Sequence, residues 1–224
     1  MKSELWRVHP IGAMETKHVD MAFTVSGRRL PRDHSAALWR ALAHALPWVE
    51  DETELAIFPV RAATVSSGSL VLNRRSRLVL RLREERVGDA LALCGRTIQV
   101  DEETLVIGKA MTRALIPHGT VYAHRVAAHD GDEAAFARQV AEELAALAVR
   151  GDFIIGKRSS ARGPAGDLTG FSVMLTGLRP HESTRLQVAG LGPYRKLGFG
   201  VFVPHRSTAA VGSDEAAAER RAFR

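Results

Sequence analysis

The chain has little cysteine, few aromatic residues and no long apolar run. Its one cysteine, Cys94, excludes a disulfide framework and a four-thiolate metal site, and its apolar neighbours predict a buried, inert thiol. No stretch approaches the ~18 uninterrupted apolar residues of a membrane-spanning helix, and the first residues lack the apolar run of a signal peptide. We therefore expect a soluble, cytoplasmic protein with no membrane partner.

The charge of the chain is positive and is carried mostly by arginine. Lys and Arg total 31 against 25 Asp and Glu, a formal net charge of +6, while 46% of the 224 residues are apolar. That apolar fraction is enough for an ordinary core in one domain or two small ones. The planar fork of arginine suits phosphate oxygens and base edges, so the balance favours a polyanionic partner. A basic surface that is merely solvated is the alternative.

The hydropathy pattern predicts the same series of elements twice. In the first half, residues 19–26 alternate as a half-buried strand, and a helix follows from Asp33, a candidate N-cap, to Pro47. The remaining elements of this half are strands at 55–60, 70–72 and 78–82, a helix at 84–94 and a long strand or hairpin at 97–107. The second half reads as a strand at 121–127, a helix at 133–149, strands at 153–155 and 171–176, a helix at 180–188 and a strand at 199–203.

Strand, helix, strand, strand, helix, strand is the order of a ferredoxin-like unit. We therefore predict an α+β protein of two tandem ferredoxin-like (βαββαβ) units, residues 1–110 and 111–206, followed by a flexible tail at 207–224. The Gly, Ser and Arg-rich segment 157–167 predicts a long, mobile connection inside the second unit.

Arginines follow one face of the strand at 78–82. Its leucines alternate with Arg77 and Arg81, which predicts an open, basic sheet face opposite the core, and Arg74 and Arg75 precede the strand in a turn. These four arginines could follow the phosphates of an RNA hairpin or simply keep an open sheet soluble.

The most informative segment is 190–200, in which four glycines form a G-x-G-x5-G-x-G pattern. Glycine lets backbone N–H groups approach a phosphate, and the residues between the glycines add positive charge and an aromatic face for a base. The RNA-binding candidates here are Gly190, Gly192, Tyr194, Arg195, Lys196, Gly198 and Gly200. A dinucleotide-binding G-x-G-x-x-G does not fit, because position 195 is arginine and the helix precedes the segment. A turn that only leads to the last strand is the alternative.

With the doubled fold and the following Val201–Pro204, this loop resembles that of the CRISPR-associated repeat-RNA endoribonucleases, the Cas6 family. Three further segments, Leu30–His34, Leu175–Leu178 and Leu186–Gln187, resemble the Myxococcus-type branch, and the resemblance spans most of residues 19–205. It implies cleavage within each repeat of the precursor transcript to give guide crRNA. The cleavage would need no metal or cofactor, because a ribose 2'-hydroxyl attacks the adjacent phosphate and leaves a 2',3'-cyclic phosphate. The implied partners are repeat RNA, as precursor and mature crRNA, and other effector-complex subunits.

Such chemistry needs groups that move protons and a cation that stabilises the phosphorane. Two histidines of the first helix compete for the proton transfer. His34 lies in the first turn, where the helix dipole favours the neutral form suited to a general base. The resemblance to several branches of the family implies a catalytic histidine there, so we favour His34 as the base. His44 lies ~15 Å further along the helix and is the alternative, because other branches place their histidine later. The resemblance also implies that Lys157 and Arg158, after the strand at 153–155, belong to a hairpin that touches RNA. From there both could reach the scissile phosphate, with Lys157 as a further catalytic candidate. A solvated hairpin is the alternative.

The chain departs from part of the family pattern. Some members add a tyrosine and a lysine to the histidine, but the first helix carries Arg40 and the two tyrosines are Tyr122 and Tyr194. A non-catalytic RNA-binding subunit of a CRISPR effector complex is therefore the alternative function. An ordinary RNA-recognition module is disfavoured, because no strand carries its paired aromatics. His124 and His129 have no spacing typical of a metal site, so no metal is expected.

Overall fold

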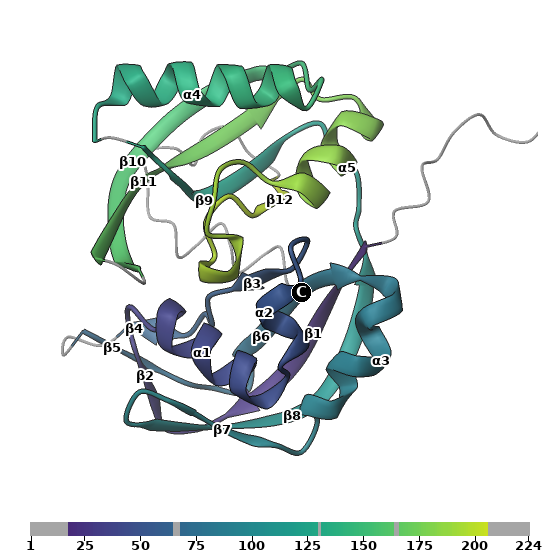
Figure 1. Ribbon diagram of the computed structural model, residues 1–224, viewed down its shortest axis with the longest axis vertical. Helices are drawn as coiled ribbons and strands as arrows, with labels where there is room; N and C mark the ends of the chain where they lie inside the picture. The colour runs from purple at the N-terminus through teal and green to yellow at the C-terminus, as the bar shows by residue number, and fades with distance from the viewer. Residues whose placement is uncertain (1–17, 65–67, 130, 164–165, 206–224) are drawn as a thin grey trace, which may run out of the picture.

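The computed structural model describes residues 18–64, 68–129, 131–163 and 166–205. These residues form two units, one above the other in Figure 1, each built from an antiparallel sheet with helices on one face. The tail predicted at 207–224 lies outside the described residues. The chain therefore repeats one arrangement of strands and helices in its two halves, which confirms the predicted α+β class with two tandem ferredoxin-like units.

The N-terminal unit contains a five-stranded sheet in the order β3-β6-β1-β8-β7. Its strands are β1 (His18–Ser26), β3 (Ala56–Phe58), β6 (Arg77–Arg83), β7 (Thr97–Val100) and β8 (Glu103–Ala114). Because β6 lies between β1 and β3, these strands form a split βαβ unit around α1 (Ser35–Ala45). Met21 and Phe23 of β1 and Leu80 of β6 point into a core that the helices cover.

Three short strands form a side sheet, β2-β5-β4, from β2 (Arg29–Pro31), β4 (Ala63–Thr64) and β5 (Ser69–Val71). The strand predicted at 70–72 therefore belongs to this sheet. The helix predicted at 84–94 is broken into 3-10 turns at Glu84–Arg86 and Leu91–Leu93 around the short α3 (Val87–Ala90). Gly88 lies in its middle, where glycine weakens a continuous helix.

The C-terminal unit has the sheet order β10-β11-β9-β12, again with the third strand next to the first. Its elements are β9 (Val121–Ala127), α4 (Glu133–Ala146), β10 (Asp152–Gly163), β11 (Gly166–Thr176), α5 (Pro180–Ala189) and β12 (Phe202–Pro204). Figure 1 shows α4 lying across this sheet at the top of the molecule, where Phe136 and Val140 enter the core. The boundary predicted after residue 110 lies inside β8, since the chain leaves the first sheet only at Ala114.

The predicted mobile connection at 157–167 is instead the outer half of a hairpin. β10 and β11 stay paired from Arg158↔Phe171 to Gly163↔Gly166, so backbone hydrogen bonds order a segment whose small and charged side chains read as a loop. The tip of the hairpin reaches the other unit, where the backbone N–H of Arg162 donates to Asp33 over 2.6 Å. Asp33 therefore does not cap α1, whose N-cap is His34.

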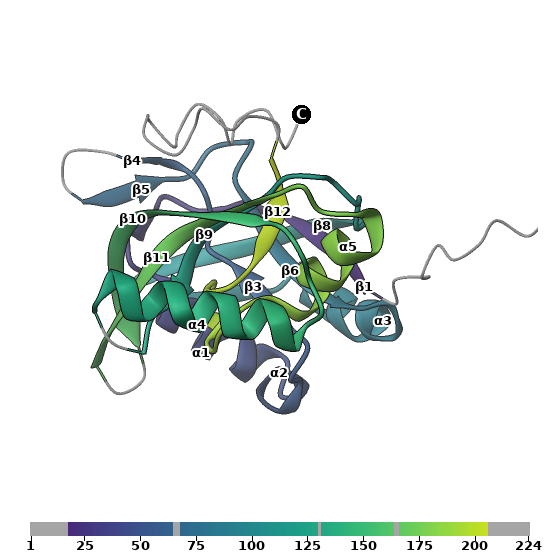
Figure 2. The ribbon, with the colours of Figure 1, turned by 90° about the horizontal axis from the view of Figure 1, so that it is seen from above.

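The outer face of the N-terminal sheet is not the open, basic face that the alternation predicted. Val79 and Phe58 are buried on it with Val201 of the C-terminal unit, and Arg81 is fully buried. Figure 2 shows the C-terminal strands β9 and β12 crossing over β3 and β6 when the molecule is seen from above. The prediction failed because an alternating pattern identifies the two faces of a strand but not what covers each face.

Cys94 is exposed rather than buried as predicted. It follows the 3-10 turn Leu91–Leu93, from which only Leu93 faces the core. Within the described part of the chain, no helix is long and apolar enough to cross a membrane.

Candidate functional site

The glycine loop, residues 190–200, joins α5 to β12 and folds back on itself. The backbone N–H of Leu191 donates to the carbonyl oxygen of Gly200 over 3.2 Å, and both Gly190 and Gly200 have positive φ angles, 70° and 65°. A Cβ at Gly200 would overlap the carbonyl of Leu191. These two glycines are therefore required for the crossing of the loop ends, whatever else the loop binds.

The loop rests on the N-terminal unit. Its 3-10 turn Arg195–Leu197 contacts both α1 and β3, and the Lys196 Nζ donates to the carbonyl oxygen of Glu50 over 2.6 Å. Figure 1 shows the loop, in yellow-green, descending from the upper unit to the level of α1. On its other side, the N–H of Gly192 donates to the carboxylate of Glu143 over 2.6 Å. Two groups predicted to hold phosphate thus have partners within the protein.

Arg195 lies inside the interface between the units. Its Nε and one of its terminal nitrogens are buried without a hydrogen-bond partner among the described residues. Burial, together with the neighbouring charge of Arg81, lowers the pKa of Arg195 to about 10. Two guanidinium groups therefore share this part of the interface, and of the two only Arg81 has a hydrogen-bond partner for each of its three nitrogens.

Arg81 joins the two units directly. It donates to both carboxylate oxygens of Asp20, over 2.7 and 2.9 Å, and to the carbonyl oxygens of Gln187 and Phe202 in the other unit. With its side chain fully buried, Arg81 has no access to an RNA phosphate.

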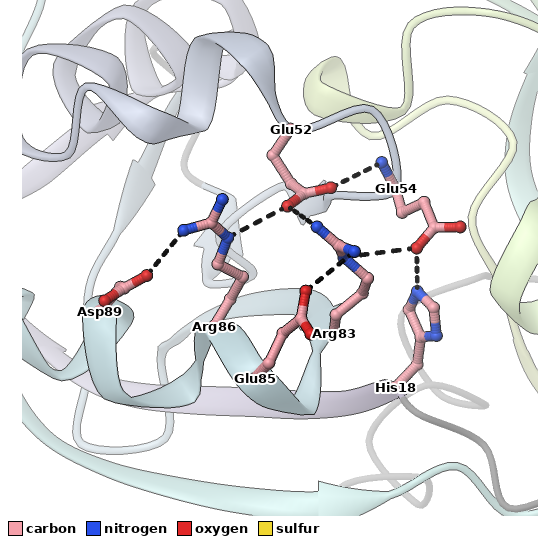
Figure 3. A network of polar contacts seen from close by, with 7 residues as sticks. All are labelled: His18, Glu52, Glu54, Arg83, Glu85, Arg86 and Asp89. Carbon is pink, nitrogen blue, oxygen red and sulfur yellow. Dashed lines mark hydrogen bonds and ion pairs between the residues drawn. The ribbon is translucent and has the colours of Figure 1, made fainter.

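A network of charged side chains lies beside Arg195 at one end of β6 (Figure 3). Arg83 contacts Glu52, Glu54 and Glu85, at 3.0, 3.5 and 2.8 Å, so this arginine is also engaged within the protein. Glu54 in turn lies 3.4 Å from His18, whose pKa is lowered by burial although Glu54 opposes that effect. The network holds the segment before β3 in place beneath the glycine loop.

The two histidines of α1 have different surroundings. His34 is buried, with Nδ1 2.8 Å from the carbonyl oxygen of Pro31, while its Nε2 accepts the backbone N–H of Val60 over 2.9 Å. These contacts require a proton on Nδ1 and leave neither nitrogen for a substrate. Burial is the main cause that lowers the pKa of His34, and it favours the neutral form that the sequence predicted from the helix dipole.

His44 is exposed and lines a groove of about 630 Å³ between α1 and the edge strand β7. Two arginines line the same groove. Arg40 lies 3.6 Å from Asp101, and Arg96 donates to the carbonyl oxygen of Ala45. The groove therefore combines an imidazole with two guanidinium groups on a surface open to a ligand. Arg96 was not identified from the sequence, because only the fold brings the start of β7 to the end of α1.

A second cavity, of about 310 Å³, lies between α1 and the glycine loop. Trp39 of α1 and Tyr194 of the loop line it, together with Arg195 and Lys196. Trp39 was not singled out from the sequence either. Trp39 packs against the core of its own unit and also against Leu197 and Phe199 of the other unit. The sequence could show the first contact but not the second, which only the fold creates.

The remaining predicted cations are dispersed. Arg74 and Arg75 are exposed in the turn before β6, where Arg77 donates to the carbonyl oxygens of Arg74 and Ser76. Lys157 and Arg158 are exposed on β10, where the outer half of the hairpin begins and away from its tip. No contact between described residues brings either pair to His34 or His44, and no three described side chains are grouped as metal ligands would be.

Comparisons with known proteins place this geometry in context. The model of the family described as Cas6 CRISPR matches residues 19–207. The CRISPR-associated endonuclease Cas6 of Myxococcus xanthus (strain DK1622) is 32% identical over 201 residues, covering 89% of this chain and 87% of that protein.

Solved structures share the fold at low identity. A CRISPR associated protein Cas6 superposes with a TM-score of 0.62 at 10% identity, covering 84% of this chain and 99% of that one. A Cas6-related protein of Pyrococcus furiosus gives a TM-score of 0.59 at 10% identity, with 83% and 97% covered. The likeness therefore extends over both units.

Proposed function

Because this chain belongs to the Cas6 family of CRISPR-associated proteins, we propose that it is an endoribonuclease that cuts CRISPR precursor RNA within its repeats to give guide crRNA. The observation that carries the catalytic part is the groove between α1 and β7, in which His44, Arg40 and Arg96 face one open volume. An exposed imidazole beside two cations is what transfer of a phosphoryl group between neighbouring oxygens requires.

In the proposed reaction the 2'-hydroxyl of the nucleotide before the cut attacks the adjacent phosphorus. The 2'-oxygen loses its proton as it bonds to phosphorus, and the bond from phosphorus to the 5'-oxygen breaks as that oxygen gains a proton. The products are a 2',3'-cyclic phosphate and a 5'-hydroxyl, and no water is consumed. His44 transfers the proton, since its exposed imidazole lines the groove, and Arg40 and Arg96 stabilise the negative charge on the phosphorane.

The proposal gives His34 a different role from His44. Because both ring nitrogens of His34 are engaged, this residue holds the start of α1 against the segment after β3, through Pro31 and Val60. His34 is thus a positioning residue, and proton transfer falls to the histidine that a substrate can reach.

The proposed RNA path uses exposed cations on both units. Arg74, Arg75, Lys157 and Arg158 contact phosphates, while Tyr194 offers an aromatic face beside the glycine loop. Arg81 has no part in this path because it is buried, and Arg195 contributes only at the wall of the cavity.

Single-turnover cleavage of the repeat RNA encoded beside the gene tests the proposal. Cleavage should persist in excess EDTA, stop when the nucleotide before the cut is 2'-deoxy, and leave a 2',3'-cyclic phosphate end, because no step uses a metal ion. Loss of cleavage on chelation, restored by Mg²⁺, would overturn the metal-free mechanism. Tight binding of the repeat without any cleavage would instead support the alternative function, a non-catalytic subunit of a CRISPR effector complex.

A further inference from the structure

The cavity between α1 and the glycine loop has walls of mixed aromatic and cationic character. Trp39 is fixed on one side, packed against Leu197 and Phe199 of the other unit, and Tyr194 stands on the other side with 41% of its surface exposed. Thr53 adds a hydroxyl, Arg195 and Lys196 add positive charge, and no carboxylate is among the described side chains that line it. Its volume of about 310 Å³ lies at the lower end of the ~300–1,000 Å³ typical of small-ligand sites.

The backbone of Tyr194 is strained to present this ring. Tyr194 has φ 69° and ψ 32°, the left-handed conformation, which is unfavourable for a residue with a side chain. Gly198 adopts the same region without that cost, and Gly192 also has a positive φ angle. A loop already rich in glycine thus has an aromatic residue at a position where glycine would be more stable. The ring is also held by an edge contact with Phe199, whose centroid is 6.3 Å away.

We propose that this cavity receives a single unpaired nucleobase of the bound RNA, which stacks between the rings of Trp39 and Tyr194. The inference rests on the proposed function and extends it, by assigning a base-binding subsite and a role for Trp39. Aromatic faces accept any base by stacking, and the adjacent cations suit the phosphate that accompanies the base. A base must leave its neighbours to enter such a site, so the occupant comes from a single-stranded part of the repeat.

The subsite adjoins the proposed catalytic groove on the same helix. Trp39 and His44 are five residues apart, which is about 7.5 Å along the axis of α1, and they line cavities on different sides of the helix. A strand that anchors one base at Trp39 can therefore pass over α1 to the groove. The anchored base would fix which phosphate reaches His44.

Replacement of Tyr194 separates stacking from stability. Tyr194→Gly removes the ring and the backbone strain together, so the protein should be at least as stable to urea as the wild type. Its affinity for a repeat RNA made uncleavable by a 2'-deoxy nucleotide at the cut should fall about 5- to 150-fold, which corresponds to ~1–3 kcal/mol for one stacked base. Tyr194→Phe, the matched control, keeps the ring and should bind as the wild type does.

Abasic substitution identifies the base. A series of uncleavable repeats, each with one base removed at a different position, is bound to the wild type and to Tyr194→Gly. In the wild type, removal of the base at one single-stranded position should weaken binding. In Tyr194→Gly, removal of the same base should have no further effect. Trp39→Phe should keep part of the effect at that site, since phenylalanine retains a smaller ring. Bound RNA should quench the tryptophan fluorescence of Trp39. The quenching should therefore occur in the wild type and in the control variant Trp48→Phe, and should be lost in Trp39→Phe.

The outcomes distinguish this inference from the proposed function. If Tyr194→Gly binds the repeat as tightly as the wild type, or if no abasic position depends on Tyr194, the base subsite is wrong even when cleavage is normal. If the chain binds RNA with the predicted dependence but never cleaves it, the subsite stands and the enzymatic proposal fails.

Discussion

Arg81 and Asp20 form a two-bond ion pair beneath the C-terminal unit, at 2.7 and 2.9 Å. The same guanidinium donates to carbonyl oxygens of Gln187 and Phe202, so one side chain of β6 satisfies acceptors from both units. This arginine therefore links the two units directly, as do the hydrogen bonds from Lys196 to Glu50 and from Arg162 to Asp33.

Arg81→Ala should therefore destabilise the protein strongly. The substitution leaves Asp20 and two carbonyl oxygens without their donor inside the interface, and removal of one partner of a buried ion pair costs about 3–5 kcal/mol. Urea unfolding measures the effect. Arg75→Ala is the matched control, because this exposed arginine should change stability by no more than about 0.5 kcal/mol. Equal stability of the two variants would show that the ion pair does not hold the units together.

Gly200→Ala should destabilise the glycine loop more than a comparable glycine elsewhere. Gly95 also has a positive φ angle, 81°, but a Cβ there meets open space, so Gly95→Ala costs only the backbone strain of about 1–3 kcal/mol. At Gly200 the added Cβ also overlaps the carbonyl of Leu191, and the loop ends must separate. Urea unfolding of both variants checks the order, and a smaller effect at Gly200 would contradict the described crossing.

Glu182 should make stability depend on pH in the acid range. The side chain and backbone N–H of Arg179 hold its pKa at about 2, below the ordinary 4.5. Since the unfolded chain binds the proton more readily, stability is complete above pH 4.5 and falls as the pH drops towards 2. In Glu182→Gln, the urea concentration at the unfolding midpoint should depend less on pH between 4.5 and 2. An unchanged slope would assign the acid sensitivity to other carboxylates.

The sequence predicts the elements better than their surroundings. Alternation in β1 and the apolar stripe of α1 identify both elements because the core lies on one side of each. Nothing in that pattern shows that Arg81 is covered by another unit, or that His34 meets the N–H of Val60, which lies 26 residues later. Trp39 and Arg96 likewise gain their roles only through contacts between distant segments.

His34→Ala should act mainly on stability. The substitution leaves the buried N–H of Val60 without an acceptor, which costs about 1–3 kcal/mol. Because burial lowers the pKa of His34 below 6.5, its neutral form stabilises the fold fully above pH 6.5, and this contribution falls as the pH decreases. The variant should therefore lose less stability than the wild type between pH 7.5 and 5.5, although His18 titrates in the same direction. Urea midpoints at both pH values test this, and a stable variant with unchanged pH dependence would contradict it.

His44→Ala should act mainly on chemistry. A positioned proton-transfer group contributes roughly a hundredfold to ten-thousandfold to the rate, so single-turnover cleavage of the repeat should slow by that factor. Affinity for uncleavable repeat RNA and stability to urea should stay close to wild type, because His44 is exposed on the last turn of α1. Arg40→Ala and Arg96→Ala should slow the same step, while His181→Ala, a substitution of an exposed histidine on α5, is the control for loss of a surface imidazole.

If His44→Ala cleaves at the wild-type rate, the groove between α1 and β7 is not the catalytic site. Cleavage would then have to occur elsewhere on the RNA path, with the cavity at Trp39 and Lys196 as the next site to test.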